Sequence, residues 1–115
     1  MLYDLSELRV FSRGDAVFEL DMIDTFLEEA SEYGETMRKG YASGDYLSVG
    51  ATAHRFKSSV NLFGMKPLHV ILNDIELACK TGHDASLMSR LMQQFDEMLG
   101  PLTQMMLAEK LRYVS

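Results

Sequence analysis

The stretch GATAHRFKSSVNLFG, residues 50–64, has the periodicity of an amphipathic helix with one histidine outside the apolar stripe. The stripe is formed by Val49, Ala53, Phe56, Val60 and Phe63. Their spacings of three and four residues place these side chains on one side of a helix, which turns about 100° per residue. His54 projects at roughly 140° from the middle of the stripe, so we expect its imidazole to be exposed.

The positions that surround His54 on this helix hold mostly small side chains. Neighbours on a helix surface lie three and four residues apart; here they are Gly50, Ala51, Lys57 and Ser58, with Asn61 one turn further on. A glycine inside a helix costs roughly 1 kcal/mol relative to alanine. We therefore interpret Gly50 and its small neighbours as clearance for a partner that approaches the histidine. The competing interpretation is a solvent-facing histidine without a function.

Similar periodicity covers the rest of the chain, and Gly-Asp or Gly-x-Asp sequences separate the segments. Helices are predicted at about residues 5–11, 15–41, 45–63, from Pro67 and from Asp84. Asp15, Asp45 and Asp84 are the expected N-caps, because an aspartate accepts hydrogen bonds from the first free N–H groups of a helix. Asp4 or Ser6 is expected to cap the short first helix.

Four amphipathic helices with short connections need one another to bury their apolar stripes. The sequence therefore predicts an all-α fold, an antiparallel up-down four-helix bundle with a short N-terminal helix capping one end. The 115 residues suit one domain, residues 1–115, and no segment alternates like a half-buried strand. Pro101 interrupts the last stripe, which continues in phase, so a kink is predicted rather than an end. The nine methionines are interpreted as core filler, with a Met-rich binding surface as the alternative.

Composition excludes several classes of function. The net charge of −6 argues against nucleic acid as a partner, because phosphate binding needs clustered Lys and Arg. No apolar run approaches the roughly 20 residues that span a bilayer, and no export signal is present, so we expect no membrane contact and a cytoplasmic location. The single cysteine, Cys79, rules out an internal disulfide and is interpreted as a buried thiol.

An exposed imidazole on a bare helix face is suited to nucleophilic chemistry. Free imidazoles lose their proton near pH ~6.5, so at neutral pH one ring nitrogen offers a lone pair. Lys57 disfavours the imidazolium form, and its ammonium can pair with phosphoryl oxygens once the ring carries them. The ring nitrogen distal to the backbone is the expected acceptor, because it reaches furthest from the helix. The sequence does not single out the group that binds the other nitrogen.

The segment AHRFKSSVNLFGMKPL, residues 53–68, resembles the signature of histidine-containing phosphotransfer (HPt) domains. The matching residues are Ala53, His54, Phe56, Lys57, Ser59, Gly64 and Leu68, followed on the next helix by Ile75, Glu76, Lys80 and Gly82. Phe56 replaces the usual leucine, and Ser58 stands where glycine is common. The resemblance extends over nearly the whole chain.

This resemblance implies a phosphocarrier of a two-component phosphorelay and not an enzyme. His54 is the implied phosphorylated residue, accepting a phosphoryl group from a receiver-domain aspartate and passing it to another receiver. The implied stabilising or docking residues are Lys57, Ser58, Gly50, Ala51, Arg55 and Asn61. No cofactor is expected on this chain, since the acidic pocket and its Mg²⁺ belong to the receiver. The implied partners are response-regulator receivers and a hybrid sensor histidine kinase, and the chain is expected to be monomeric.

Two alternatives belong to other classes. A helical interaction module could bind a receiver or sensor kinase without carrying phosphate. A metal site formed by His69, His83 and Cys79 would lack the usual ligand spacing, so no metal is expected. The sequence also has no Gly-rich phosphate loop and no Gly-x-Ser-x-Gly turn, which argues against an active site of its own.

Overall fold

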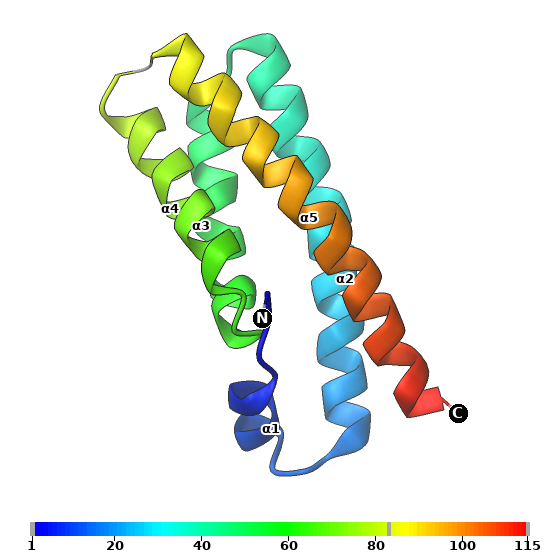
Figure 1. Ribbon diagram of the computed structural model, residues 1–115. Helices are drawn as coiled ribbons and strands as arrows, with labels where there is room; N and C mark the ends of the chain where they lie inside the picture. Colours follow the sequence, from blue (N-terminus) through cyan, green and yellow to red (C-terminus); the bar gives the residue numbers. More distant parts are fainter. Residues whose placement is uncertain (1, 83, 115) are drawn as a thin grey trace.

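The computed structural model describes residues 2–82 and 84–114, and within them every regular element is an α-helix (Figure 1). The helices are α1 (Ser6–Ser12), α2 (Ala16–Ser43), α3 (Tyr46–Leu62), α4 (Lys66–Lys80) and α5 (Ala85–Val114). Helices α2 to α5 run alternately up and down, each beside the next, and α5 packs against α2 to close the bundle. The predicted all-α, antiparallel four-helix architecture is confirmed.

Most of the predicted helix boundaries rest on the expected aspartate caps. The Asp15 carboxylate accepts from the Phe18 N–H at 3.1 Å, and the Asp45 carboxylate accepts from the Ser48 N–H at 3.2 Å. Asp84 accepts from the N–H groups that open α5, at 2.8 Å and 3.4 Å. These four hydrogen bonds satisfy N–H groups that have no partner within the helix.

The predicted cap of α1 is wrong. Leu5 occupies the N-cap position, and no side chain caps it. Leu5 is 4% exposed, so the packing of its side chain into the core determines where the helix begins. Asp4 still accepts a hydrogen bond from the Ser6 N–H at 2.9 Å, from outside the helix.

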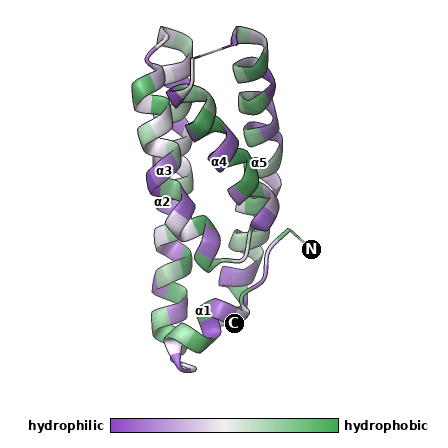
Figure 2. Ribbon diagram, turned by 90° about the vertical axis from the view of Figure 1, so that its left-hand side faces the viewer, coloured by the Kyte–Doolittle hydropathy of each residue, from purple (hydrophilic) through white to green (hydrophobic). Residues whose placement is uncertain are grey.

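Helix α5 continues through Pro101, as the in-phase apolar pattern predicted. The core between the four long helices consists of large side chains at under 2% exposure, including Phe26, Phe56, Phe63 and Phe95. Hydrophobic and hydrophilic residues alternate along the helices, as amphipathic packing requires (Figure 2). Five methionines are buried and three pack partly buried against the core, which confirms their interpretation as core filler for the described part of the chain.

Helix α1 closes one end of the bundle because α2 and α5 are much longer than the other two helices. They have 28 and 30 residues against 17 in α3 and 15 in α4, which at about 1.5 Å per residue leaves an overhang. Helix α1 lies in this overhang, below α3 and α4 in Figure 1, and buries Leu8 completely. Tyr3 donates to Glu109 at 2.6 Å and so joins the N-terminal segment to α5.

The turn between α3 and α4 depends on a glycine. Gly64 has φ +62°, in the left-handed region that disfavours other residues. A Cβ atom at this position would lie 2.5 Å from the Asp4 carbonyl oxygen, because the Asp4 N–H bonds to the Phe63 carbonyl at 3.0 Å. Gly64 therefore lets the N-terminal segment cross directly over the end of α3.

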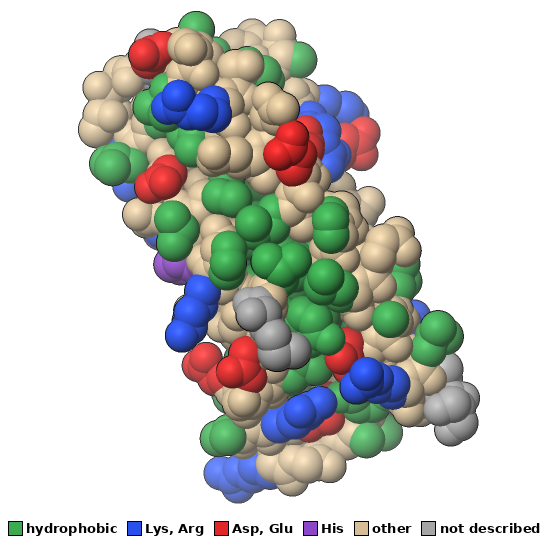
Figure 3. Space-filling model, in the orientation of Figure 1, with side chains coloured by type: hydrophobic (Ala, Val, Ile, Leu, Met, Phe, Trp, Pro, Cys, Tyr) green, Lys and Arg blue, Asp and Glu red, His purple; other side chains and the backbone are tan. Residues whose placement is uncertain are grey.

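Apolar side chains are not confined to the interior. On the face seen in Figure 3 they form a band along the middle of the molecule, over the line between α4 and α5. Val70 contributes to the exposed apolar surface of α4. Within residues 2–82 and 84–114, no helix combines the length and the apolar character needed to cross a membrane.

Candidate functional site

His54 lies in the middle of α3 with its side chain 67% exposed, which confirms the predicted exposure. Its Nδ1 atom lies 2.7 Å from Oε2 of Glu76 on α4. A carboxylate only accepts, so this hydrogen bond fixes the proton of the neutral ring on Nδ1. The lone pair is then on Nε2, the nitrogen further from the helix backbone.

Glu76 is held by three partners although its side chain is only 9% exposed. Lys57 Nζ lies 2.6 Å from Oε1, and Lys80 Nζ lies 3.2 Å from Oε2, the same oxygen that binds His54. The hydrogen bond from Lys57, together with those from Lys80 and His54, lowers the pKa of Glu76 to about 2 against the opposing effect of burial. Glu76 is therefore an anion throughout the physiological pH range.

The relative position of α3 and α4 at the site depends on Gly50. Gly50 is buried, and a Cβ atom there would lie 2.9 Å from Cβ of Cys79 on α4. The two helix backbones approach each other closely at this point, one turn from His54. The structure thus gives Gly50 a role within this chain, because its missing side chain accommodates α4. Gly50 also lines the groove beside the histidine, so clearance for a partner stays a prediction.

The other predicted site residues lie around His54 in two groups. Ala51 and Arg55 are exposed and line, with His54, a groove of about 380 Å³ between α3 and α4. Ser58 and Asn61 are exposed on α3 but lie outside that groove. The groove is completed by Tyr46, Leu47, Gly50, Glu76, Cys79 and Lys80.

Lys57 is 20% exposed and lies on the other side of Glu76, at a smaller hollow of about 220 Å³. Its Nζ also donates to Oδ1 of Asn73 at 3.3 Å. In this structure its ammonium is bound to Glu76 and Asn73 on α4. The sequence placed Lys57 correctly on the helix but did not reveal these partners.

Three contributors to the site, Glu76, Lys80 and Leu47, were not recognised from the sequence. Glu76 and Lys80 belong to the matched family pattern, and their spacing of four on one helix is a signal for an ion pair. Their role beside the histidine depends on how α4 is rotated against α3, which local periodicity does not give. Leu47, at 86% exposure, is a large apolar residue at the edge of the groove.

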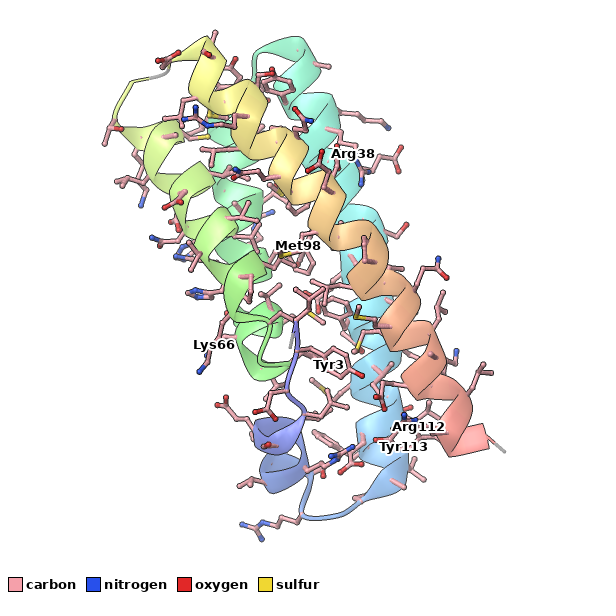
Figure 4. All side chains as sticks on the ribbon, in the orientation of Figure 1. Tyr3, Arg38, Lys66, Met98, Arg112 and Tyr113 are labelled. Atoms are coloured by element: carbon pink, nitrogen blue, oxygen red, sulfur yellow. The ribbon has the colours of Figure 1, made fainter. Side chains whose placement is uncertain are left out.

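A larger cavity of about 540 Å³ lies at the end of the bundle closed by α1. Figure 4 shows Tyr3, Lys66 and Arg112 around this end of the molecule. The cavity is lined by Tyr3, Asp4, Leu5, Arg9, Gly64, Lys66, Glu109 and Arg112. Its three basic residues face two carboxylates, so its charge is nearly balanced.

Of the three residues considered for a metal site, the structure describes His69 and Cys79. His69 is partly buried on α4, and burial raises the pKa of the partly buried Cys79 thiol. His83 lies outside the described residues. Within the described residues, no group of three or more His, Cys, Asp or Glu side chains could hold a metal ion.

Comparison with known proteins agrees with this geometry. A family model described as Hpt domain matches residues 21–105, and the chain therefore belongs to the Hpt domain family. The fold matches the crystal structure of histidine-containing phosphotransfer protein B (HptB) from Pseudomonas aeruginosa PAO1, with a TM-score of 0.85 and 19% sequence identity. That match covers 97% of this chain and 96% of the HptB chain. No curated protein sequence matches.

Membership of this family defines the class of function. Hpt domains are phosphocarrier modules of two-component signalling and not catalysts. They interact with receiver domains and kinases in phosphorelays. The chain is thus a phosphotransfer module, as its sequence predicted.

Proposed function

We propose that His54 carries the phosphoryl group, accepting it on Nε2 from a receiver-domain aspartate and handing it to a second receiver. The observation that carries this proposal is the hydrogen bond between His54 Nδ1 and Glu76 on an otherwise exposed imidazole. It leaves a nucleophilic nitrogen directed away from the bundle.

In the proposed step, the Nε2 lone pair attacks the phosphorus of an aspartyl phosphate. The Nε2–P bond forms as the P–O bond to the aspartate breaks, and the aspartate leaves as a carboxylate. The ring keeps its proton on Nδ1 and so gains positive charge. The Glu76 carboxylate, 2.7 Å from Nδ1, stabilises this charge as it develops. Transfer to the second receiver reverses the same bond changes.

Lys57 is proposed to stabilise the phosphoryl group after transfer. It lies one helical turn from His54, and the flexible stem of a lysine allows its ammonium to exchange partners. Phosphoryl oxygens accept charge-assisted hydrogen bonds strongly. The ammonium can therefore move from Glu76 to the new anion beside it.

The groove beside His54 is proposed as the place where the receiver docks. Its rim carries Arg55 and Lys80, and Leu47 presents an exposed apolar side chain at its edge. This local positive charge, on a chain of net charge −6, complements the acidic active site expected on a receiver. Mg²⁺ is proposed to reside on the receiver, and a hybrid sensor kinase is the proposed source of the phosphate. We propose that the chain acts as a monomer.

The proposal is tested by incubating the protein with receiver domains that have been charged with acetyl phosphate. We expect transfer to this chain of one phosphoryl group that is labile to acid and stable to base. His54→Gln should abolish the transfer and leave the helical circular dichroism spectrum unchanged. Binding of a charged receiver without transfer would instead identify an interaction module. Full labelling of His54→Gln would exclude His54 as the acceptor.

A further inference from the structure

One carboxylate oxygen of Glu76 has two partners of different kinds. Oε2 lies 2.7 Å from His54 Nδ1 and 3.2 Å from Lys80 Nζ. Because both groups bind the same oxygen, the ammonium and the ring nitrogen are within about 6 Å of each other. Lys80 is the more exposed of the two lysines that contact Glu76, with its side chain 70% exposed against 20% for Lys57.

A buried carboxylate beside an imidazole has two opposing effects on a nucleophile. It fixes the tautomer that leaves Nε2 free, but its negative charge also favours the imidazolium form, in which Nε2 carries a proton and cannot attack. Here Lys57 and Lys80 together offset that charge. With both ammonium groups in place, the carboxylate and its two lysines carry a net charge of about +1.

We propose that Lys80 is a positioning residue that keeps His54 in its neutral, nucleophilic form by offsetting the charge of Glu76. This role rests on the proposed function of His54 and is exerted before any phosphoryl group arrives. Lys80 thereby extends the pH range over which the module accepts phosphate.

The other charged and titratable groups facing His54 come from α3 and α4. Arg55 and Lys57 lie on α3, and both act in the same direction as Lys80. Tyr46 on α3 and Cys79 on α4 also line the groove, and burial raises the pKa of the Cys79 thiol. Glu76 is the one carboxylate among the described residues that line the groove.

The expected size of the effect follows from the separation of the charges. Two unit charges about 6 Å apart in a water-like dielectric shift a titration midpoint by about 0.5 pH unit. Removing the Lys80 charge should therefore raise the midpoint of the His54 titration by about that amount. A midpoint raised by about 0.5 pH unit lowers the neutral fraction of the ring by at most about threefold, in acid solution, and hardly at all in alkaline solution.

Two measurements on Lys80→Gln test this role. Histidine NMR resonances give the titration midpoint of His54 without any partner. The rate of labelling by phosphoramidate, a small donor whose phosphorus is attacked by Nε2 with release of ammonia, gives reactivity as a function of pH. We expect a raised midpoint and labelling up to about threefold slower than in the parent protein in acid solution, with equal rates in alkaline solution.

Matched variants separate charge from structure. Lys80→Arg should restore the parental midpoint and pH profile. Lys39→Gln removes a lysine that also pairs with a glutamate four residues away, at 2.9 Å, and should leave His54 unaffected. An unchanged titration midpoint in Lys80→Gln would overturn the inference. So would a labelling rate reduced by the same factor at every pH, because that result would indicate direct contact between Lys80 and the phosphoryl group. Absence of labelling in the parent protein would refute the proposed function, while the midpoint shift would still decide the role of Lys80.

Discussion

Replacement of Glu76 by glutamine should make the free energy of unfolding of this protein less dependent on pH in acid solution. In the folded state the pKa of Glu76 is lowered from 4.5 to about 2 by Lys57, Lys80 and His54. A carboxyl group with a lowered folded-state pKa stabilises the protein fully above its unfolded-state pKa. That contribution is lost as the pH falls through the folded-state pKa. The relevant window is therefore about pH 4.5 down to about pH 2.

The magnitude follows from the size of this shift. Each pKa unit corresponds to about 1.4 kcal/mol, so the full shift would contribute about 3 kcal/mol. His54 and Lys80 are 67% and 70% exposed, and solvent weakens their interaction with the carboxylate. We therefore expect Glu76→Gln to reduce the free energy of unfolding by about 1–3 kcal/mol at pH 5.5.

The assay is urea unfolding of the parent and Glu76→Gln proteins at several pH values between 5.5 and 2. The difference in free energy of unfolding should shrink steadily through this range and nearly vanish at the acidic end. Carrying out the same comparison in a His54→Gln background removes the titration of the imidazole. A difference that stays constant with pH would show that the ion pairs of Glu76 are not the source of its stabilisation, and would refute the reasoning.

Two further predictions concern α3. Gly50→Ala should lower the melting temperature, because overpacking costs about 1–3 kcal/mol and exceeds the gain of about 1 kcal/mol in helix propensity. The same substitution should cost less in a Cys79→Gly background, which lacks the Cβ atom that it contacts, and an equal cost in both backgrounds would place the strain elsewhere. Ser58→Arg should slow phosphotransfer from a receiver while changing the melting temperature by no more than a few degrees, since residue 58 is exposed and outside the core. Unchanged transfer kinetics would mean that the docked receiver does not cover this position.

The fold was predictable because its signals are local. The aspartates at residues 15, 45 and 84 accept hydrogen bonds from groups two or three residues away, so a single segment carries the information for each boundary. The capping position of α1 was missed because Leu5 occupies it, and Leu5 is buried in the core. Local capping preferences cannot report that contact.

The site was predictable only in part for the same reason. Exposure of His54 follows from its angle to the apolar stripe of its own helix. The role of Gly50 cannot be inferred in the same way. A missing side chain can make room either for a partner protein or for a neighbouring helix of the same chain. Glu76 lies 22 residues from His54 in the sequence, and only the packing of α4 against α3 brings their side chains together.

The close approach of the α3 and α4 backbones has a kinetic consequence. His54 and its three charged neighbours all stand on these two helices, so no loop has to order itself before the ring can react. The imidazole is oriented when the protein folds. Ordering of this chain therefore adds no entropic cost to the activation barrier of phosphoryl transfer. The rate of phosphoryl transfer should then depend on how often a phosphorylated receiver binds, and in what orientation.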